Sequence, residues 1–287
     1  MTVWPKTMPA LVTPFTAAGD LDGSAHFSNV ATMVERGANG LVLAGSTGEG
    51  PLLEPGERQT LTSIARQTAP DLTIVCGVHA ESTRQAIDGV SEAAEAGADA
   101  ALVVTPTSVV RGRLSSVTAH YTAVADAATI PVLLYSVPSV TAWELPVGVV
   151  EGTARHPNIV GMKDSGGDPD RMPSLSSAND GDFIVYAGAS RALEASARAG
   201  AWGAITASAN YALTDVSLAA QGDPQAQQRL TQLTAIIEPH GIAGTKHAAR
   251  AIGIEPAHSR HPIMDLEQQA IDEIDAALEA AGLRTNQ

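Results

Sequence analysis

The stretch "EAGADAALVVTP" at residues 95–106 shows the pattern that decides the fold, because the pattern occurs twice more in the chain. "ERGANGLVLAGS" spans residues 35–46 and "RAGAWGAITASA" spans residues 198–209. In each copy a helical run ends at Gly-Ala, two residues turn, and a short apolar run follows. Glycine ends a helix at little cost because it accepts the left-handed conformation. Each copy therefore predicts a helix that leads directly into a buried strand.

Further apolar runs have the length of strands. They are "PALVT" (9–13), "LTIVCG" (72–77), "IPVLLY" (130–135), "NIVGMK" (158–163) and "DFIVYAG" (182–188). With the three repeats they make eight strands, separated by segments of helical character. Continuous apolar strands that alternate with helices indicate a parallel sheet covered by helices. Eight such units predict an α/β fold of the (β/α)8 TIM barrel type, since an open doubly wound sheet usually has fewer strands.

Beyond residue 210 the pattern is helical only. We therefore expect a (β/α)8 barrel over residues 1–210 and a C-terminal helical extension, packed on the barrel, over residues 211–287. The length of 287 residues suits this division, because such barrels commonly run to about 250 residues as one domain.

Composition narrows the range of partners. The formal net charge is −14, so the field of the whole protein repels nucleic acid and anionic membranes, and neither is expected as a partner. Cys76 is the only cysteine, which excludes an intramolecular disulfide. The start "MTVWPKTMPA" lacks the basic and then apolar order of a signal peptide, and no apolar run reaches about 18 residues. We expect a soluble, cytoplasmic protein.

In a (β/α)8 barrel, function lies at the C-terminal ends of the strands. Lys163 ends the sixth strand, where Ile159, Gly161 and Lys163 are expected to share one face, with the glycine leaving room inside the barrel. Burial disfavours a charged ammonium, and a neutral amine is a nucleophile that forms a Schiff base with a ketone. The alternative is a lysine that reaches the surface and pairs with Asp164.

Two other strand ends carry polar groups. Tyr135 ends the fifth strand, where a phenol can pass protons to an iminium adduct; alternatively, its hydroxyl bonds to the backbone and closes the barrel. "GSTGEG" (45–50) matches neither a dinucleotide nor a Walker motif, but its amides and the Ser46 and Thr47 hydroxyls can hold a carboxylate. The alternative is a plain turn, with Glu49 facing solvent.

A metal site is not predicted. The chain has eight histidines but no H-E-x-x-H, and "HSRH" (258–261) has no obvious third ligand. A metal-dependent aldolase is therefore disfavoured.

Three motifs follow one another at the predicted strand ends: "GSTGE" (45–49), "YSVP" (135–138) and "GMKDSGGD" (161–168). With these motifs the chain resembles the dihydrodipicolinate synthase and N-acetylneuraminate lyase family of class I aldolases, from about Pro9 through the C-terminal helices. Within that family, "HPNIVGMKDSGGD" and "GIAGTKHAARAIG" are most similar to 4-hydroxy-2-oxoglutarate aldolases.

The resemblance implies that Lys163 forms a Schiff base with the keto carbon of pyruvate or another 2-oxo acid, so that no cofactor is needed. Ser46 and Thr47 would bind the carboxylate of this acid, and Tyr135 would relay the proton. Thr47 is grouped with Lys163 and Tyr135 as a catalytic residue. The resemblance also implies a homo-oligomer, either a dimer or a tetramer.

The remaining site residues are matched by position. Gly188 and Ile205 correspond to residues that line the family's pocket. Thr107 and Ser108 stand where the family usually has paired tyrosines, one of which reaches into a neighbouring subunit's site. Ser108 is taken as a substrate contact.

Val140 and His79 also depart from the family's pattern. Val140 replaces the arginine of dihydrodipicolinate synthases or the asparagine of oxoglutarate aldolases, and a valine cannot hold a carboxylate. This disfavours dihydrodipicolinate synthase itself and predicts an aldehyde less acidic than glyoxylate or aspartate semialdehyde. His79 replaces a residue that is commonly glycine and would supply a proton, narrow the pocket, or have no role.

The leading hypothesis is a Schiff-base aldolase, a lyase that cleaves or forms a carbon–carbon bond between a 2-oxo acid and an aldehyde. A dehydratase of a 2-oxo-3-deoxy sugar acid is the first alternative, because the same iminium acidifies C3 for loss of water. A non-catalytic barrel that binds a 2-oxo acid is the second.

Overall fold

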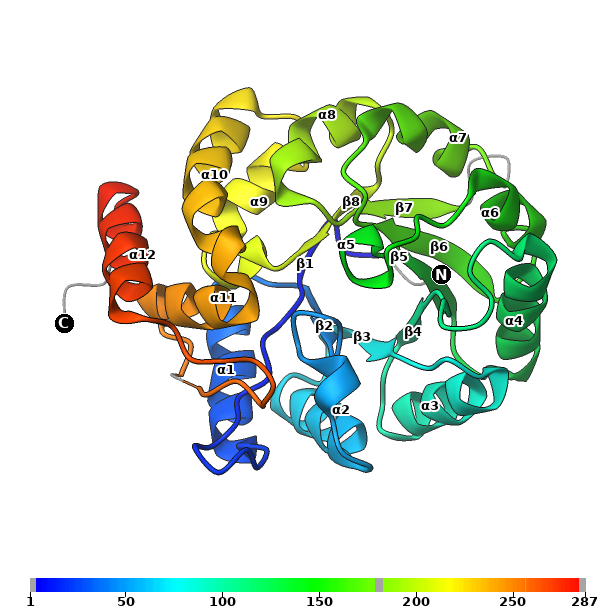
Figure 1. Cartoon of the computed structure of the whole chain (residues 1–287), viewed down its shortest axis with the longest axis horizontal. Coiled ribbons are helices and arrows are strands. Elements are labelled where there is room, and N and C mark those ends of the chain that lie inside the picture. Colours follow the sequence, from blue (N-terminus) through cyan, green and yellow to red (C-terminus); the bar gives the residue numbers. More distant parts are fainter. Residues whose placement is uncertain (1–3, 179–182, 256, 284–287) are drawn as a thin grey trace.

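The computed structural model describes residues 4–178, 183–255 and 257–283. In this part of the chain eight strands form one parallel sheet, in the order β1-β8-β7-β6-β5-β4-β3-β2. The two edge strands approach each other through a parallel bridge between Ala10 and Val42, so the sheet closes almost completely (Figure 1). The prediction of a (β/α)8 barrel with C-terminal helices is confirmed.

The strands have the following bounds: β1 Thr7–Pro9, β2 Gly40–Leu43, β3 Thr73–Val78, β4 Ala100–Val104, β5 Val132–Ser136, β6 Ile159–Asp164, β7 Ile184–Ala187 and β8 Gly203–Thr206. The predicted seventh strand began at Asp182, which lies outside the described residues. The repeats behave as expected, because Gly37, Gly97 and Gly200 end their helices with φ of +91°, +96° and +101°.

The predicted position of the first strand, residues 9–13, is wrong. β1 pairs with β8 through Thr7–Pro9, and the Ala10 amide adds one more bond to the Thr206 carbonyl, at 3.1 Å. The apolar residues that follow leave this ladder: the Leu11 amide donates to the Val42 carbonyl at 2.9 Å and the Val12 amide donates to Asn210 Oδ1 at 3.1 Å. Leu11 and Val12 are apolar because they are buried with Val30 and Met33 of α1, and a buried loop can be as apolar as a strand.

The helices have the following bounds: α1 Gly23–Glu35, α2 Glu57–Thr68, α3 Thr83–Glu95, α4 Leu114–Ala127, α5 Pro138–Thr141, α6 Val147–Thr153, α7 Met172–Ser176, α8 Leu193–Arg198, α9 Leu213–Ala219, α10 Pro224–Ile237, α11 Gly241–Ala249 and α12 Gln268–Ala280. The helices from α1 to α9, except the short α5, surround the strands, while α10, α11 and α12 lie together at one side (Figure 1). α9 contacts both β1 and β8, and α10 packs on α9. The division at residue 210 stays a prediction.

The apolar core has an inner and an outer layer. Met8, Leu102, Tyr135 and Ile205 belong to the cluster inside the barrel, and larger clusters fill the space between strands and helices. None of the helices in the described part of the chain has both the length and the hydrophobicity that a membrane span requires.

The prediction that Ile159, Gly161 and Lys163 share one face of β6 is wrong for Ile159. Val132 of β5 is opposite Ile159, but Leu133 is opposite Gly161, so β6 carries a bulge between these pairs. Ile159 therefore packs with Met162 in the outer layer, whereas Lys163 borders a cavity inside the barrel rim. A simple two-residue period does not anticipate an extra residue.

Candidate active site

A cavity of about 640 Å³ opens at the C-terminal ends of the strands. Its wall is built by the loops after β2, β5, β6, β7 and β8 and by segments of the C-terminal extension. Such a volume is typical of small-molecule sites. The cavity brings together six of the predicted site residues: Ser46, Thr47, Tyr135, Val140, Lys163 and Gly188.

Lys163 is buried at the edge of this cavity. Its side chain is 5% exposed, and Nζ donates a hydrogen bond to the Tyr135 hydroxyl at 3.2 Å. The two residues are direct neighbours in the β5–β6 register, which explains the contact. The alternative of a surface lysine paired with Asp164 is wrong: Asp164 is itself buried, accepts from the Gly166 amide, and lies 3.7 Å from Arg171 Nε.

The Tyr135 hydroxyl contacts side chains. It donates to Ser46 Oγ at 3.4 Å and accepts from Lys163, so the alternative of a purely backbone-bonded tyrosine is wrong. Burial raises the pKa of Tyr135, but the Lys163 charge and hydrogen bonds with Ser46, Lys163 and Ser165 outweigh burial and bring the pKa below its ordinary value. Tyr135 is therefore a better proton donor than a free phenol.

The loop after β2 presents hydroxyl and amide donors to the cavity. Ser46 and Thr47 both line the cavity, but Ser46 is the one that contacts Tyr135. The backbone amides of Ser46 and Thr47 have no hydrogen-bond partner among the residues that the structure describes. Thr13 Oγ1 donates to the Gly48 carbonyl at 2.6 Å and holds the loop from beneath. Unpaired amides beside hydroxyls can bind a carboxylate.

Glu49 does not face solvent, so the alternative of a plain exposed turn is wrong. It is 1% exposed, forms an ion pair with Lys246 through Oε1, and accepts the Arg260 amide through Oε2 at 2.8 Å. Burial lowers the pKa of Lys246, and the Glu49 carboxylate opposes this effect. The loop is thus anchored to α11 and to the segment that follows α11.

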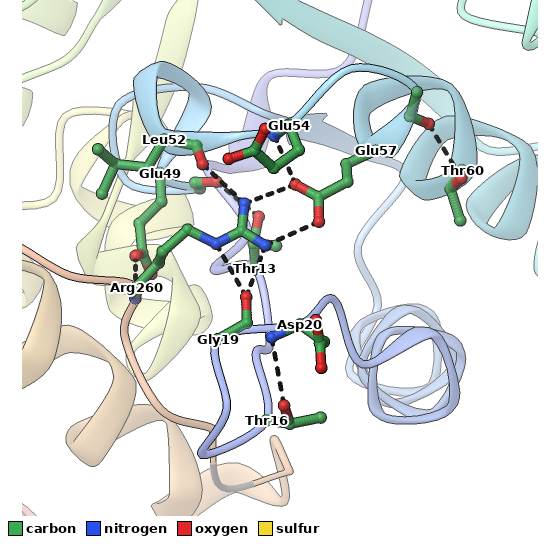
Figure 2. Close-up of polar contacts among 12 residues, drawn as sticks. Thr13, Thr16, Gly19, Asp20, Glu49, Leu52, Glu54, Glu57, Thr60 and Arg260 are labelled. Atoms are coloured by element: carbon green, nitrogen blue, oxygen red, sulfur yellow. Dashed lines mark hydrogen bonds and ion pairs between the residues drawn. The ribbon is translucent and has the colours of Figure 1, made fainter.

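Figure 2 shows how Arg260 extends this anchor. Its guanidinium donates two hydrogen bonds to the Glu57 carboxylate, at 2.6 and 2.7 Å, and others to the carbonyls of Gly19 and Leu52. Sequence reasoning missed Arg260 and Lys246, because their partners are about 200 residues away along the chain.

Gly188 leaves the space that Lys163 needs. A Cβ atom on Gly188 would lie 2.9 Å from Lys163 Cε and would overlap Ser165 Oγ. Any side chain at position 188 would therefore push into the lysine. Ser165 itself lines the cavity and was missed by the sequence analysis, although it lies two residues after the lysine.

Three predicted contacts lie outside the cavity wall. Ile205 is fully buried inside the barrel, and Ser108 is exposed, with its amide donating to Glu81 at 2.8 Å. His79 lies behind the loop after β2: a Cβ on Gly50 would be 2.6 Å from its ring. Burial lowers the pKa of His79 to about 3, so this imidazole is neutral at pH 7. The structure therefore gives none of the three a direct contact with this space.

Val140 lies on α5 at the rim and is 59% exposed. Thr107 is buried, and its amide also donates to Glu81. No cluster of three or more potential metal ligands occurs in the described ranges.

Comparisons with known proteins show what the whole chain is similar to. A family model for the "Dihydrodipicolinate synthetase family" matches residues 4–281. The 4-hydroxy-tetrahydrodipicolinate synthases of Ruegeria pomeroyi and Rhizobium meliloti are 35% and 32% identical to the chain, each over 96% of the chain and 98% of the relative.

Solved structures show the same likeness. The dihydrodipicolinate synthase of Acinetobacter baumannii, complexed with pyruvate, has a TM-score of 0.88 and 31% identity, and the match covers 97% of this chain and 99% of that one. A prophage protein from E. coli K12 has a TM-score of 0.91 at 24% identity, covering 98% and 100% of the two chains, which shows the shared fold. The chain belongs to the dihydrodipicolinate synthetase family.

Proposed function

We propose that this protein is a class I aldolase, a lyase that makes or breaks a carbon–carbon bond between pyruvate and an aldehyde through a Schiff base on Lys163. One observation carries the proposal: a buried lysine amine at a barrel strand end lies 3.2 Å from a tyrosine hydroxyl, inside a cavity. Membership of the family supports the lyase class, and the pyruvate complex of the A. baumannii relative supports the substrate class.

The proposed chemistry begins when the Lys163 ammonium gives up a proton and the resulting amine attacks C2 of pyruvate. Tyr135 protonates the departing oxygen, water leaves, and an iminium forms. The Tyr135 phenolate then accepts a proton from C3, which gives an enamine. C3 of the enamine attacks the aldehyde carbon, and Tyr135 returns the proton to the oxygen of that aldehyde, which becomes a hydroxyl. Water then hydrolyses the new iminium, which releases the product and restores the amine. The iminium stabilises the developing carbanion, so this sequence requires no cofactor.

The hydrogen-bond donors of the loop after β2 bind the substrate and do not react with it. The amides and hydroxyls of Ser46 and Thr47 hold the pyruvate carboxylate, which places C2 beside Lys163. Ser46 also exchanges a proton with Tyr135, since the two oxygens are 3.4 Å apart.

The names of the relatives favour a second candidate, synthesis of 4-hydroxy-tetrahydrodipicolinate. Val140 disfavours this synthase activity, because a valine side chain offers no group that binds the distal carboxylate of aspartate semialdehyde. Product analysis distinguishes the other two alternatives. A product with an intact carbon skeleton indicates a dehydratase, and binding of the 2-oxo acid without turnover indicates a non-catalytic barrel.

Borohydride reduction in the presence of pyruvate tests the proposal. The iminium is reduced to a stable amine, so mass spectrometry should find the added mass on the peptide containing Lys163. Lys163→Ala should show no adduct, and Tyr135→Phe should form it slowly. Absence of the adduct, or its presence on another lysine, would overturn the proposal.

A further inference from the structure

The cavity is much larger than the corner that pyruvate would occupy. Beyond Lys163, Tyr135 and the loop after β2, its wall includes apolar side chains and a few polar ones. The larger aliphatic ones are Leu52, Val137, Val140, Ile242 and Ile263. A second substrate must bind against this surface. The polar groups of the surface decide which chemical groups that substrate can carry.

Arg191 is the cation of this second region. Apart from Lys163, it is the only lysine or arginine that lines the cavity in the described part of the chain. It lies in the short helical turn Ser190–Ala192 after β7, three residues from Gly188. The position is therefore set by the same strand that makes room for Lys163.

The Arg191 guanidinium is held in place without being neutralised. Its Nη2 donates to the Gly166 carbonyl at 2.7 Å. Gly167 has φ of +74°, and a Cβ there would lie 2.7 Å from Arg191 Cζ, so the two groups are in close contact. No carboxylate of the described residues forms an ion pair with Arg191. One carbonyl uses one of five N–H donors, which leaves others for a ligand.

Two acidic side chains also line the cavity, and they differ in whether their charge is already paired. Glu49 is buried and already paired with Lys246. Glu238 is exposed at the end of α10 and contributes a negative charge to the rim. Apart from Lys163, Arg191 is therefore the one cationic partner for an anion among the described residues of a wall that also carries serine and threonine hydroxyls.

We infer that Arg191 selects a second substrate that carries a carboxylate at the end remote from its reacting carbonyl. This inference rests on the proposed function and names the substrate class for that site. A guanidinium binds a carboxylate through two parallel hydrogen bonds and carries a full charge. The cation comes from the loop after β7, so under this inference Val140 does not require a neutral aldehyde.

A trapping series measures this selection without knowledge of the natural aldehyde. The full chain is titrated with 2-oxoglutarate, 2-oxoadipate and 2-oxopimelate, and with 2-oxo monocarboxylic acids of the same lengths. Borohydride then fixes the adduct on Lys163, and the concentration for half-maximal labelling is compared. At one or more chain lengths the distal carboxylate should lower this concentration by about ten-fold or more.

Substitutions test whether Arg191 causes the preference for a distal carboxylate. Arg191→Gln should abolish it while leaving labelling by pyruvate and by the monocarboxylic acids within about two-fold, and Arg191→Lys should restore part of it. Arg198→Gln is the matched control, because Arg198 is an exposed arginine on α8 that does not line the cavity. This variant should keep the wild-type preference.

The outcomes separate the two proposals. Labelling by pyruvate without a preference for any dicarboxylate, or a preference that survives in Arg191→Gln, overturns the role of Arg191 alone. A loss of pyruvate labelling in Arg191→Gln shows a structural role instead and also overturns it. If wild-type protein is not labelled by pyruvate at Lys163, the proposed function itself fails.

Discussion

At the scale of single residues, the main question is whether Ser46 or Thr47 supplies the hydroxyl that exchanges a proton with Tyr135. Family resemblance grouped Thr47 with Lys163 as catalytic and gave Ser46 the carboxylate only. The geometry favours Ser46, whose Oγ lies 3.4 Å from the Tyr135 oxygen. Two adjacent hydroxyl residues in one loop cannot be distinguished by spacing, because a turn decides which of them points at the neighbouring strand.

Ser46→Ala and Thr47→Val distinguish these roles. We expect Ser46→Ala to lower kcat by about 10- to 100-fold, because Tyr135 loses its proton partner. Thr47→Val should mainly raise KM for pyruvate, because it removes a carboxylate contact. Steady-state kinetics with pyruvate as the varied substrate checks both, and the opposite pattern would assign the relay to Thr47.

Buried histidine and carboxylate groups connect elements of secondary structure. His26 of α1 is 1% exposed, and its Nε2–H donates to the Leu61 carbonyl of α2 at 3.1 Å. Burial lowers the pKa of His26 from 6.5 to about 4. Between these pH values the unfolded chain binds a proton that the folded chain does not bind, so stability falls as the pH decreases.

His26→Gln should reduce this pH dependence, because glutamine keeps a donor for Leu61 without titrating. The wild-type free energy of unfolding should lose about 2 kcal/mol more than that of the variant between pH 7 and pH 5, at about 1.4 kcal/mol per pH unit. Urea unfolding at both pH values measures the difference. Parallel pH profiles for the two proteins would contradict the prediction.

The Glu49–Lys246 ion pair joins the loop after β2 to α11. Both side chains are almost completely buried, at 0% and 4% exposure. Lys246→Met leaves the carboxylate buried without its charge partner and should cost about 3–5 kcal/mol of stability. It should also weaken pyruvate binding, because the loop carries Ser46 and Thr47.

A double-mutant cycle separates the ion pair from general packing. Glu49→Gln combined with Lys246→Met removes both charges and should recover part of the stability that Lys246→Met loses. Urea unfolding of the four proteins gives the coupling energy. Strictly additive effects would show that the pair contributes nothing specific.

At the scale of the whole molecule, the extension completes the site as well as covering the barrel. Arg260 and Lys246 hold the barrel loops, and Ile242 and Ile263 line the cavity. One apolar cluster contains side chains of α8 and α9 together with those of α10, α11 and α12. The shared core implies that barrel and extension fold together, although their sequence patterns differ.

We therefore expect a single cooperative unfolding transition. Hydrogen exchange followed by mass spectrometry at increasing urea should give one common opening free energy for peptides of β5 and of α10. An earlier opening of α10 and α12 would contradict this expectation. The predicted homo-oligomer is a separate matter, which light scattering decides by comparing the solution mass with 29.4 kDa per chain.

The sequence by itself determined the fold class and the position of the proposed nucleophile. Helix-stop glycines and continuous apolar strands depend on local conformation and on burial, and both are visible in the order of residues. Parallel strands of a barrel bring their C-terminal ends to one rim. The sequence could therefore predict which residues meet at the cavity: Lys163, Tyr135, Ser46, Thr47 and Gly188.

Only the tertiary structure decided the start of β1, the bulge in β6, the burial of Glu49, and the contacts of Lys246, Arg260 and Arg191. The bulge depends on register between neighbouring strands, and the ion pairs join residues about 200 positions apart along the chain. Arg191 stands three residues after Gly188, but only the folded turn Ser190–Ala192 shows that its side chain reaches the cavity wall. Such features arise from packing between distant segments, which local sequence pattern does not encode.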